Sequence, residues 1–104
     1  MIGKLGSAVL SADVYTAVYT VPAETSATIN IAAVNRNAED VPVRIAITNQ
    51  AETPLDSDFV EFNAVVPGNG GVLERTGIVV GAGEKVMVYA SKEDMTVRIH
   101  GFEN

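Results

Sequence analysis

Hydrophobic and polar residues alternate along most of this 104-residue chain, and a period of two predicts β-strands. The alternation is clearest in residues 27–34 and 41–48, where β-branched side chains are frequent. A polar bend, residues 35–40, separates the two runs and contains Asn and Asp, which favour turns. We predict two antiparallel strands whose shared apolar face is the centre of the core. The bend is longer than a two-residue hairpin loop, so direct pairing of the two strands stays open.

The same alternation predicts five further strands, at residues 14–21, 59–66, 71–80, 85–91 and 95–101. Turn-forming Gly, Pro, Asn and Asp residues separate them, and a bulge or break is expected at Gly77. The side chains expected to face the core in these strands include Tyr19, Val21, Val60, Phe62 and Val66. No segment has the apolar spacing of an amphipathic helix.

This pattern predicts an all-β fold: an antiparallel β-sandwich, Ig-like or jelly-roll-like, of about seven or eight strands. Residues 14–104 are expected to form a single sandwich domain. Residues 1–13 are rich in Gly, Ser and Ala, and we expect them to form an extended N-terminal arm with a short edge strand near 8–11. Two interpretations of that arm stay open, a frayed terminus and an arm that orders against a neighbouring subunit.

Composition narrows the classes of function. The net charge is −6, and no basic stripe with interleaved aromatic residues is present, so nucleic-acid binding is not expected. No apolar run approaches the roughly 20 residues that span a bilayer, so no membrane partner is expected. The chain has no cysteine, which rules out disulfides and thiolate zinc sites. The only early apolar run, residues 8–10, is too short for a signal-peptide core, so we expect the N-terminus to be retained.

Few residues are candidates for catalysis or for binding a metal ion or phosphate. His100 is the only histidine and shares the polar side of the last strand with Arg98, so a surface or interface role is favoured over a catalytic triad or metal site. The densest acidic segment contains Glu52, Asp56, Asp58 and Glu61. It matches no complete calcium-binding loop, so a solvated loop is the favoured interpretation. The glycines at 68, 70 and 71 precede a strand and predict a turn, not a phosphate cradle.

We therefore predict no catalytic, cofactor-binding or metal-binding residues, no cofactor, and a chain that is not an enzyme. A glycan-binding surface is a possible use of Tyr15, Tyr19 and Tyr89, since aromatic rings stack on the apolar faces of sugars. Packing in a core or an interface is the commoner use of such residues.

Six segments together resemble a family of small all-β structural proteins in tailed bacteriophage particles. They are LGSAVLSA (5–12), VYTVPAE (18–24), IAAVNRN (31–37), VPVRIAIT (41–48), TGIVVGAGEKVMVYAS (76–91) and TVRIHGFEN (96–104). The second segment is similar to the family's recurring YTVPAG, with Glu24 where glycine is usual, which leaves the turn type there open. The resemblance covers nearly the whole chain, and it depends on the order and spacing of the segments.

The resemblance implies a virion structural protein, made in the host cytoplasm, that acts by protein–protein assembly. Capsid decoration (cement) is favoured over a neck, tail or fibre position, because the chain is a lone compact domain without a coiled-coil stalk. The expected partners are other virion proteins and further copies of the chain, through edge strands and the arm. The expected assembly contacts are Leu5, Val9, Leu10, Tyr15 and Tyr89. The alternative from a different class is a module that binds a host glycan receptor.

Overall fold

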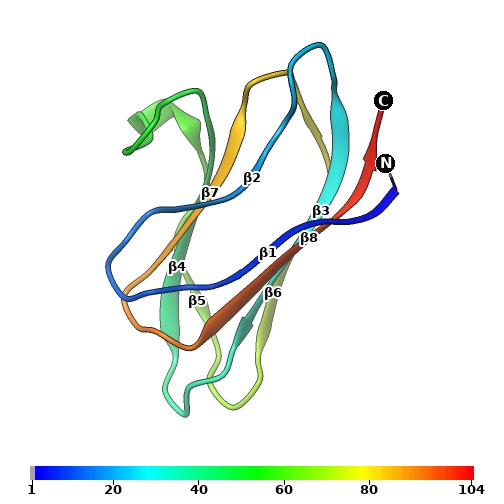
Figure 1. The fold of residues 1–104 in the computed structure, drawn as a ribbon. Helices are drawn as coiled ribbons and strands as arrows, with labels where there is room; N and C mark the ends of the chain where they lie inside the picture. The colour runs from blue at the N-terminus through cyan, green and yellow to red at the C-terminus, as the bar shows by residue number, and fades with distance from the viewer. Residues whose placement is uncertain (1) are drawn as a thin grey trace.

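The computed structural model describes residues 2–104 and has eight strands in two four-stranded antiparallel sheets that pack face to face (Figure 1). The first sheet has the order β1 (Ile2–Val9), β8 (Met95–Glu103), β3 (Ala27–Asn35) and β6 (Val72–Val80). The second sheet has the order β2 (Thr16–Thr20), β7 (Lys85–Ala90), β4 (Val41–Thr48) and β5 (Phe59–Val66). A short 3-10 helix, Asp56–Asp58, precedes β5. The predicted antiparallel β-sandwich is confirmed.

The core fills the space between the sheets, and its centre is formed by β3 and β4, the two strands with the clearest alternation. In β3 every second side chain is buried, and β4 buries Val41, Val43 and Ile45. The two strands nevertheless belong to different sheets and do not pair with each other. The bend at 36–40 carries the chain from one sheet to the other, so the two apolar faces meet across the core. No helix within residues 2–104 is long and apolar enough to cross a bilayer.

The N-terminal segment is part of the sandwich. Residues 2–9, predicted as an arm with a short strand near 8–11, form an edge strand that pairs with β8 along its length. A register shift between Lys4 and Gly6 interrupts the alternation, which is why the sequence shows no clean period there. A β-carbon at Gly6 would lie 2.3 Å from the carbonyl oxygen of Val18. The small residues therefore allow β1 to approach β2 closely.

The prediction for β5 is partly wrong. Val66 is buried and Val60 packs against the core as expected, but Phe62 is 57% exposed. The register between β4 and β5 shifts next to Arg44, and Asn63 there has a positive φ of 55°. This bulge reverses the inside–outside alternation, so Phe62 points to the outer face of the second sheet.

The bulge predicted at Gly77 is confirmed. The register of β6 on β3 shifts at this point, and Gly77 has a φ of 67°. Its backbone N–H donates to Oδ1 of Asn30, at 3.0 Å. The bulge leaves Arg75 at the edge of the sandwich, where it forms an ion pair of 3.1 Å with Glu61 of β5.

Tyr19 is buried, as predicted, and joins the two sheets. Its hydroxyl donates a hydrogen bond to the carboxylate of Glu103, which connects β2 to the end of β8. Burial of the ring, together with this hydrogen bond and the nearby negative charge, raises the pKa of Tyr19 far above its ordinary value.

We expect Tyr19→Phe to lower the free energy of unfolding by about 1–2 kcal/mol at neutral pH, because a hydrogen bond to a charged acceptor is lost. A raised pKa in the folded state gives stability that is complete below the unfolded pKa of 10.0 and is lost as the pH rises above it. The difference between the two proteins should therefore shrink above pH 10. Denaturant unfolding at several pH values measures it, and a difference independent of pH would contradict the assignment.

The turn after Pro22 favours glycine at position 24. Glu24 has a φ of 59°, a left-handed conformation that costs most residues about 1 kcal/mol relative to glycine. We expect Glu24→Gly to raise the free energy of unfolding by about 0.5–1 kcal/mol, measured as a shift of the denaturation midpoint. Ala23→Gly is the control, since that exposed residue has no positive φ and its replacement should be neutral or destabilising.

Candidate functional site

Four aromatic rings gather on the outer face of the second sheet. They come from separate parts of the chain: Tyr15 just before β2, Phe59 and Phe62 on β5, and Tyr89 on β7. The ring centroids of Tyr15 and Tyr89 are 4.8 Å apart, those of Tyr15 and Phe59 6.2 Å, and those of Phe59 and Phe62 5.0 Å. These spacings are typical of packed aromatic pairs. We call these four rings the aromatic cluster.

Arg44 lies among the rings and holds the aromatic cluster together. Its guanidinium carbon is 4.3 Å from the ring centroid of Phe62 and 4.8 Å from that of Tyr89, which is within cation–π range. The same guanidinium donates to the hydroxyl of Tyr15 at 3.0 Å and to Oδ1 of Asn63 at 2.8 Å. The bulge in β5 that moves Phe62 outward therefore also supplies a hydrogen-bond acceptor for Arg44.

The aromatic cluster shields a second, smaller apolar layer. Ala46 and Met87 are cross-strand partners on the outer face of the second sheet, yet they are only 0% and 2% exposed. Phe59 is the β5 neighbour of Ala46, and Tyr89 follows Met87 on the same side of β7. The hydroxyl of Tyr89 donates to Asp13 at 2.9 Å, and this bond is the main reason that the pKa of Tyr89 is raised. The cluster can stack on a flat apolar partner mainly through Phe62, its most exposed ring.

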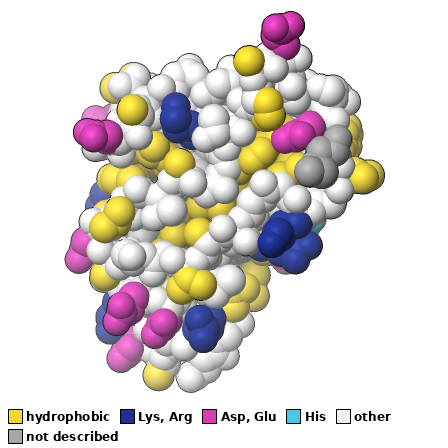
Figure 2. Space-filling model, viewed as in Figure 1, with side chains coloured by type: hydrophobic (Ala, Val, Ile, Leu, Met, Phe, Trp, Pro, Cys, Tyr) yellow, Lys and Arg dark blue, Asp and Glu magenta, His cyan; other side chains and the backbone are white. Residues whose placement is uncertain are grey.

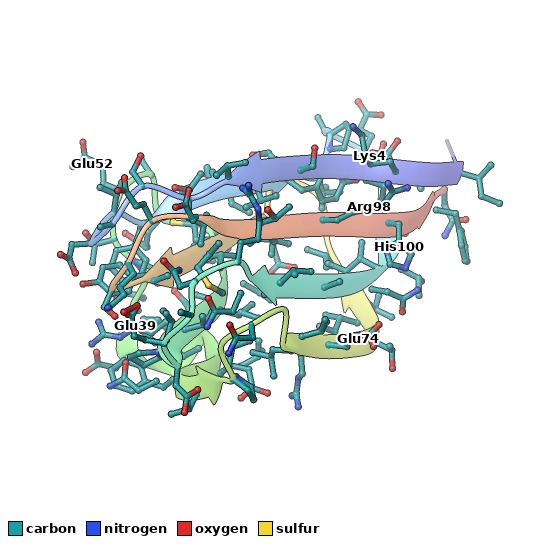
Figure 3. The ribbon with its side chains drawn as sticks, turned by 90° about the horizontal axis from the view of Figure 1, so that it is seen from below. Lys4, Glu39, Glu52, Glu74, Arg98 and His100 are labelled. Carbon is teal, nitrogen blue, oxygen red and sulfur yellow. The ribbon has the colours of Figure 1, made fainter. Side chains whose placement is uncertain are left out.

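Side chains on the outer face of the first sheet form four rows across its strands, as the strand register shows. The two end rows are mainly apolar: Val9, Thr96, Val34 and Val72 in one, and Ile2, Phe102, Thr28 and Val79 in the other. The two middle rows are polar: Ser7, Arg98, Ala32 and Glu74 in one, and Lys4, His100 and Asn30 in the other. Figure 3 shows Lys4 on β1, Arg98 and His100 on β8, and Glu74 on β6 of this sheet.

His100 occupies the polar side of β8, as predicted. It lies between Lys4 of β1 and Asn30 of β3, near Arg98 (Figure 3), and Figure 2 shows a group of Lys and Arg side chains, in dark blue, at the right of the molecule. Its Nδ1 atom is buried and has no hydrogen-bond partner within residues 2–104. Residues 2–104 contain no group of three or more His, Cys, Asp or Glu side chains that could hold a metal ion.

The acidic segment 52–61 includes a structural carboxylate. Asp58 accepts a hydrogen bond from the hydroxyl of the buried Thr48 at 2.6 Å and another from the backbone N–H of Leu55 at 2.9 Å. Its Oδ2 atom therefore fixes the loop that leads into β5.

The five residues predicted as assembly contacts have different environments. Val9 is exposed in an end row of the first sheet, and Tyr15 and Tyr89 are half-buried in the aromatic cluster. Leu5 lies in the bulge of β1 and packs against the core. Leu10 is 2% exposed and cannot contact a partner in the intact fold, because the chain turns inward after β1 and its N–H bonds to the carbonyl of Met95.

The structure separates the three tyrosines that the sequence grouped as a possible glycan surface. Tyr15 and Tyr89 are adjacent, whereas Tyr19 is buried elsewhere. The sequence pattern did not identify Phe59, Phe62 and Arg44 as members of a surface site. Comparison of the chain with protein-family models, with curated proteins and with solved structures gave no match.

Proposed function

We propose that this chain is a structural protein of a tailed bacteriophage particle, a capsid decoration protein that acts by binding other virion proteins. Two observations support this. The sequence resembles that family over nearly its whole length, and the chain folds as a compact β-sandwich with apolar side chains on its outer faces. A neck, tail or fibre position is the alternative within the same class.

The placement of exposed apolar side chains carries the proposal. Nine large hydrophobic side chains within residues 2–104 are exposed, and five of them lie in the end rows of the first sheet. These five are Ile2, Val9, Val72, Val79 and Phe102. Exposed apolar groups that gather on one face are typical of protein–protein contacts. In a symmetric shell, many such contacts act together, so each of them need only be weak.

Copy number in purified particles tests the proposal. The amount of this chain relative to the major shell protein, measured by quantitative mass spectrometry, should be near one copy per shell subunit for a decoration protein. A handful of copies per particle would place it at the neck or tail instead. Its absence from intact particles would contradict the whole proposal.

The aromatic cluster favours a second candidate, a glycan-binding module. Phe62 is exposed, with Arg44 between it and Tyr89, and aromatic rings of this kind stack on sugars. A glycan array with the purified chain tests this candidate, and Phe62→Ala should abolish any signal. No binding at high protein concentration would remove it.

A further inference from the structure

We propose that the outer face of the first sheet binds a second copy of this chain, with the two sheets packed face to face about a twofold axis that runs parallel to the strands. The axis passes between β8 and β3, the two central strands of the sheet. This inference rests on the arrangement of side chains on that face and does not depend on the proposed function.

The proposed axis places like rows opposite each other. A twofold axis along the strands puts β1 opposite β6 of the second copy and β8 opposite β3, without exchanging the ends of the strands. Val9 then faces Val72 of the other copy, and Ile2 faces Val79. Ile2 and Val79 are the most exposed of the large hydrophobic side chains, at 82% and 73%, so their burial gives the largest apolar gain.

Charge complementarity supports the same arrangement. The face is basic on the side of β1 and β8, with Lys4 and Arg98, and acidic on β6, with Glu74 (Figure 3). The proposed axis places Glu74 of the second copy opposite Ser7, between Lys4 and Arg98. Within residues 2–104 none of these three charged side chains has an ion-pair partner in its own copy. Each interface would thus contain the same charge contact twice.

The size of the face indicates a weak dimer. Four strands spaced by about 4.8 Å, each contributing about eight residues, present roughly 500 Å² per copy, or roughly 1,000 Å² for the pair. Specific interfaces usually bury about 1,200–2,000 Å² in total, so this one lies below the ordinary range. We therefore expect association that depends on concentration and weakens at high salt, since the charge contacts are at the surface.

Exchanging the charges of Arg98 and Glu74 tests the proposed arrangement of the dimer. In sedimentation equilibrium of the purified full chain at low salt, the average mass should rise with concentration toward two copies. Arg98→Glu and Glu74→Arg should each weaken the dimer by about tenfold, because each places like charges opposite each other twice. The double variant restores opposite charges at positions 98 and 74 and should recover most of the lost association, although Lys4 stays basic.

A matched control separates this contact from an effect of net charge. Lys85→Glu makes the same change in net charge as Arg98→Glu, but it lies on the outer side of β7 in the second sheet. It should leave the dimer unchanged. A wild-type chain that stays a single copy at every concentration would overturn the proposal. Single variants that associate normally, a double variant that does not recover, or an equal loss with Lys85→Glu would also overturn it.

Discussion

Replacing Asn35 by Asp is expected to lower the free energy of unfolding by about 3–5 kcal/mol at neutral pH. Asn35 is fully buried at the end of β3. Its Nδ2 donates to the carbonyl oxygens of Glu39, at 2.8 Å, and Val66, at 3.0 Å, and its Oδ1 accepts from the backbone N–H of Asn37 at 2.9 Å. An ionised aspartate would direct a buried negative charge at two carbonyl oxygens, and a protonated one has a single O–H donor, so at least one of the two carbonyl oxygens loses its hydrogen bond.

Denaturant unfolding of wild type and variant measures this effect, and acidification gives a second signature. Burial raises the pKa of a carboxyl, so the folded variant holds a proton that the unfolded chain has released at neutral pH. The penalty should therefore shrink as the pH falls from neutral toward the ordinary carboxyl pKa of about 4, and it should be smallest below that pH, where both states are protonated. The control Asn49→Asp makes the same chemical change at an exposed residue after β4 and should cost about 1 kcal/mol or less. A loss below 1 kcal/mol at Asn35 would contradict its assigned role.

Asn35 also shows how far the sequence predicts the fold. It continues the buried positions 27, 29, 31 and 33 of β3, but its polar side chain and the residues after it indicate a turn. Both predictions, a buried strand position and a turn, are correct. The strand ends at a buried side-chain amide, and the bend that follows supplies hydrogen-bond partners for it. What the sequence could not show is that the partners include Val66, 31 residues away. Alternation identifies a buried position, and only the folded chain shows which backbone groups meet there.

Bulges explain why alternation does not predict burial in some strands. A period of two predicts the burial of β3 and β8 because both strands pair in continuous register with each other. In β5 an extra residue beside Asn63 turns Phe62 outward, and a second register shift, between Ile45 and Ala46 of β4, returns Val60 to the core side. In β1 the shift between Lys4 and Gly6 likewise removes any regular pattern. Asn63 adopts the positive φ in β5, and asparagine tolerates that conformation, but one asparagine in a strand is too weak a signal to place a bulge.

The candidate surfaces depend on strand order even more than on register. The side chains of Arg44 and Tyr89 alternate with the buried side chains of their strands. Their contact requires that β7 pair with β4, although the two strands are far apart in the sequence. The rows on the first sheet likewise need β1 and β6 at opposite edges. Sequence could therefore supply some members of each surface, such as Tyr15 and Tyr89, but not the neighbours that make the surface.

Gly101 carries the second large expected effect. It lies in β8 between Gly3 of β1 and Ile29 of β3, with a φ of 151°. A β-carbon at this position would lie 2.0 Å from the carbonyl oxygen of Thr28. We expect Gly101→Ala to lower the free energy of unfolding by about 3–5 kcal/mol, because the methyl group adds a backbone clash to an unfavourable φ.

Gly70→Ala separates the two causes in the same unfolding experiment. Gly70 also has a positive φ, 90°, but a β-carbon there would meet nothing within 4 Å, so this variant should lose only about 1–2 kcal/mol. Equal losses at both sites would show that conformational strain alone decides the cost. A larger loss at Gly101 means that the backbones of β3 and β8 must approach closely. That approach places Phe102 beside Thr28 in an end row, so Gly101→Ala should also weaken the proposed dimer at concentrations where the variant is still folded.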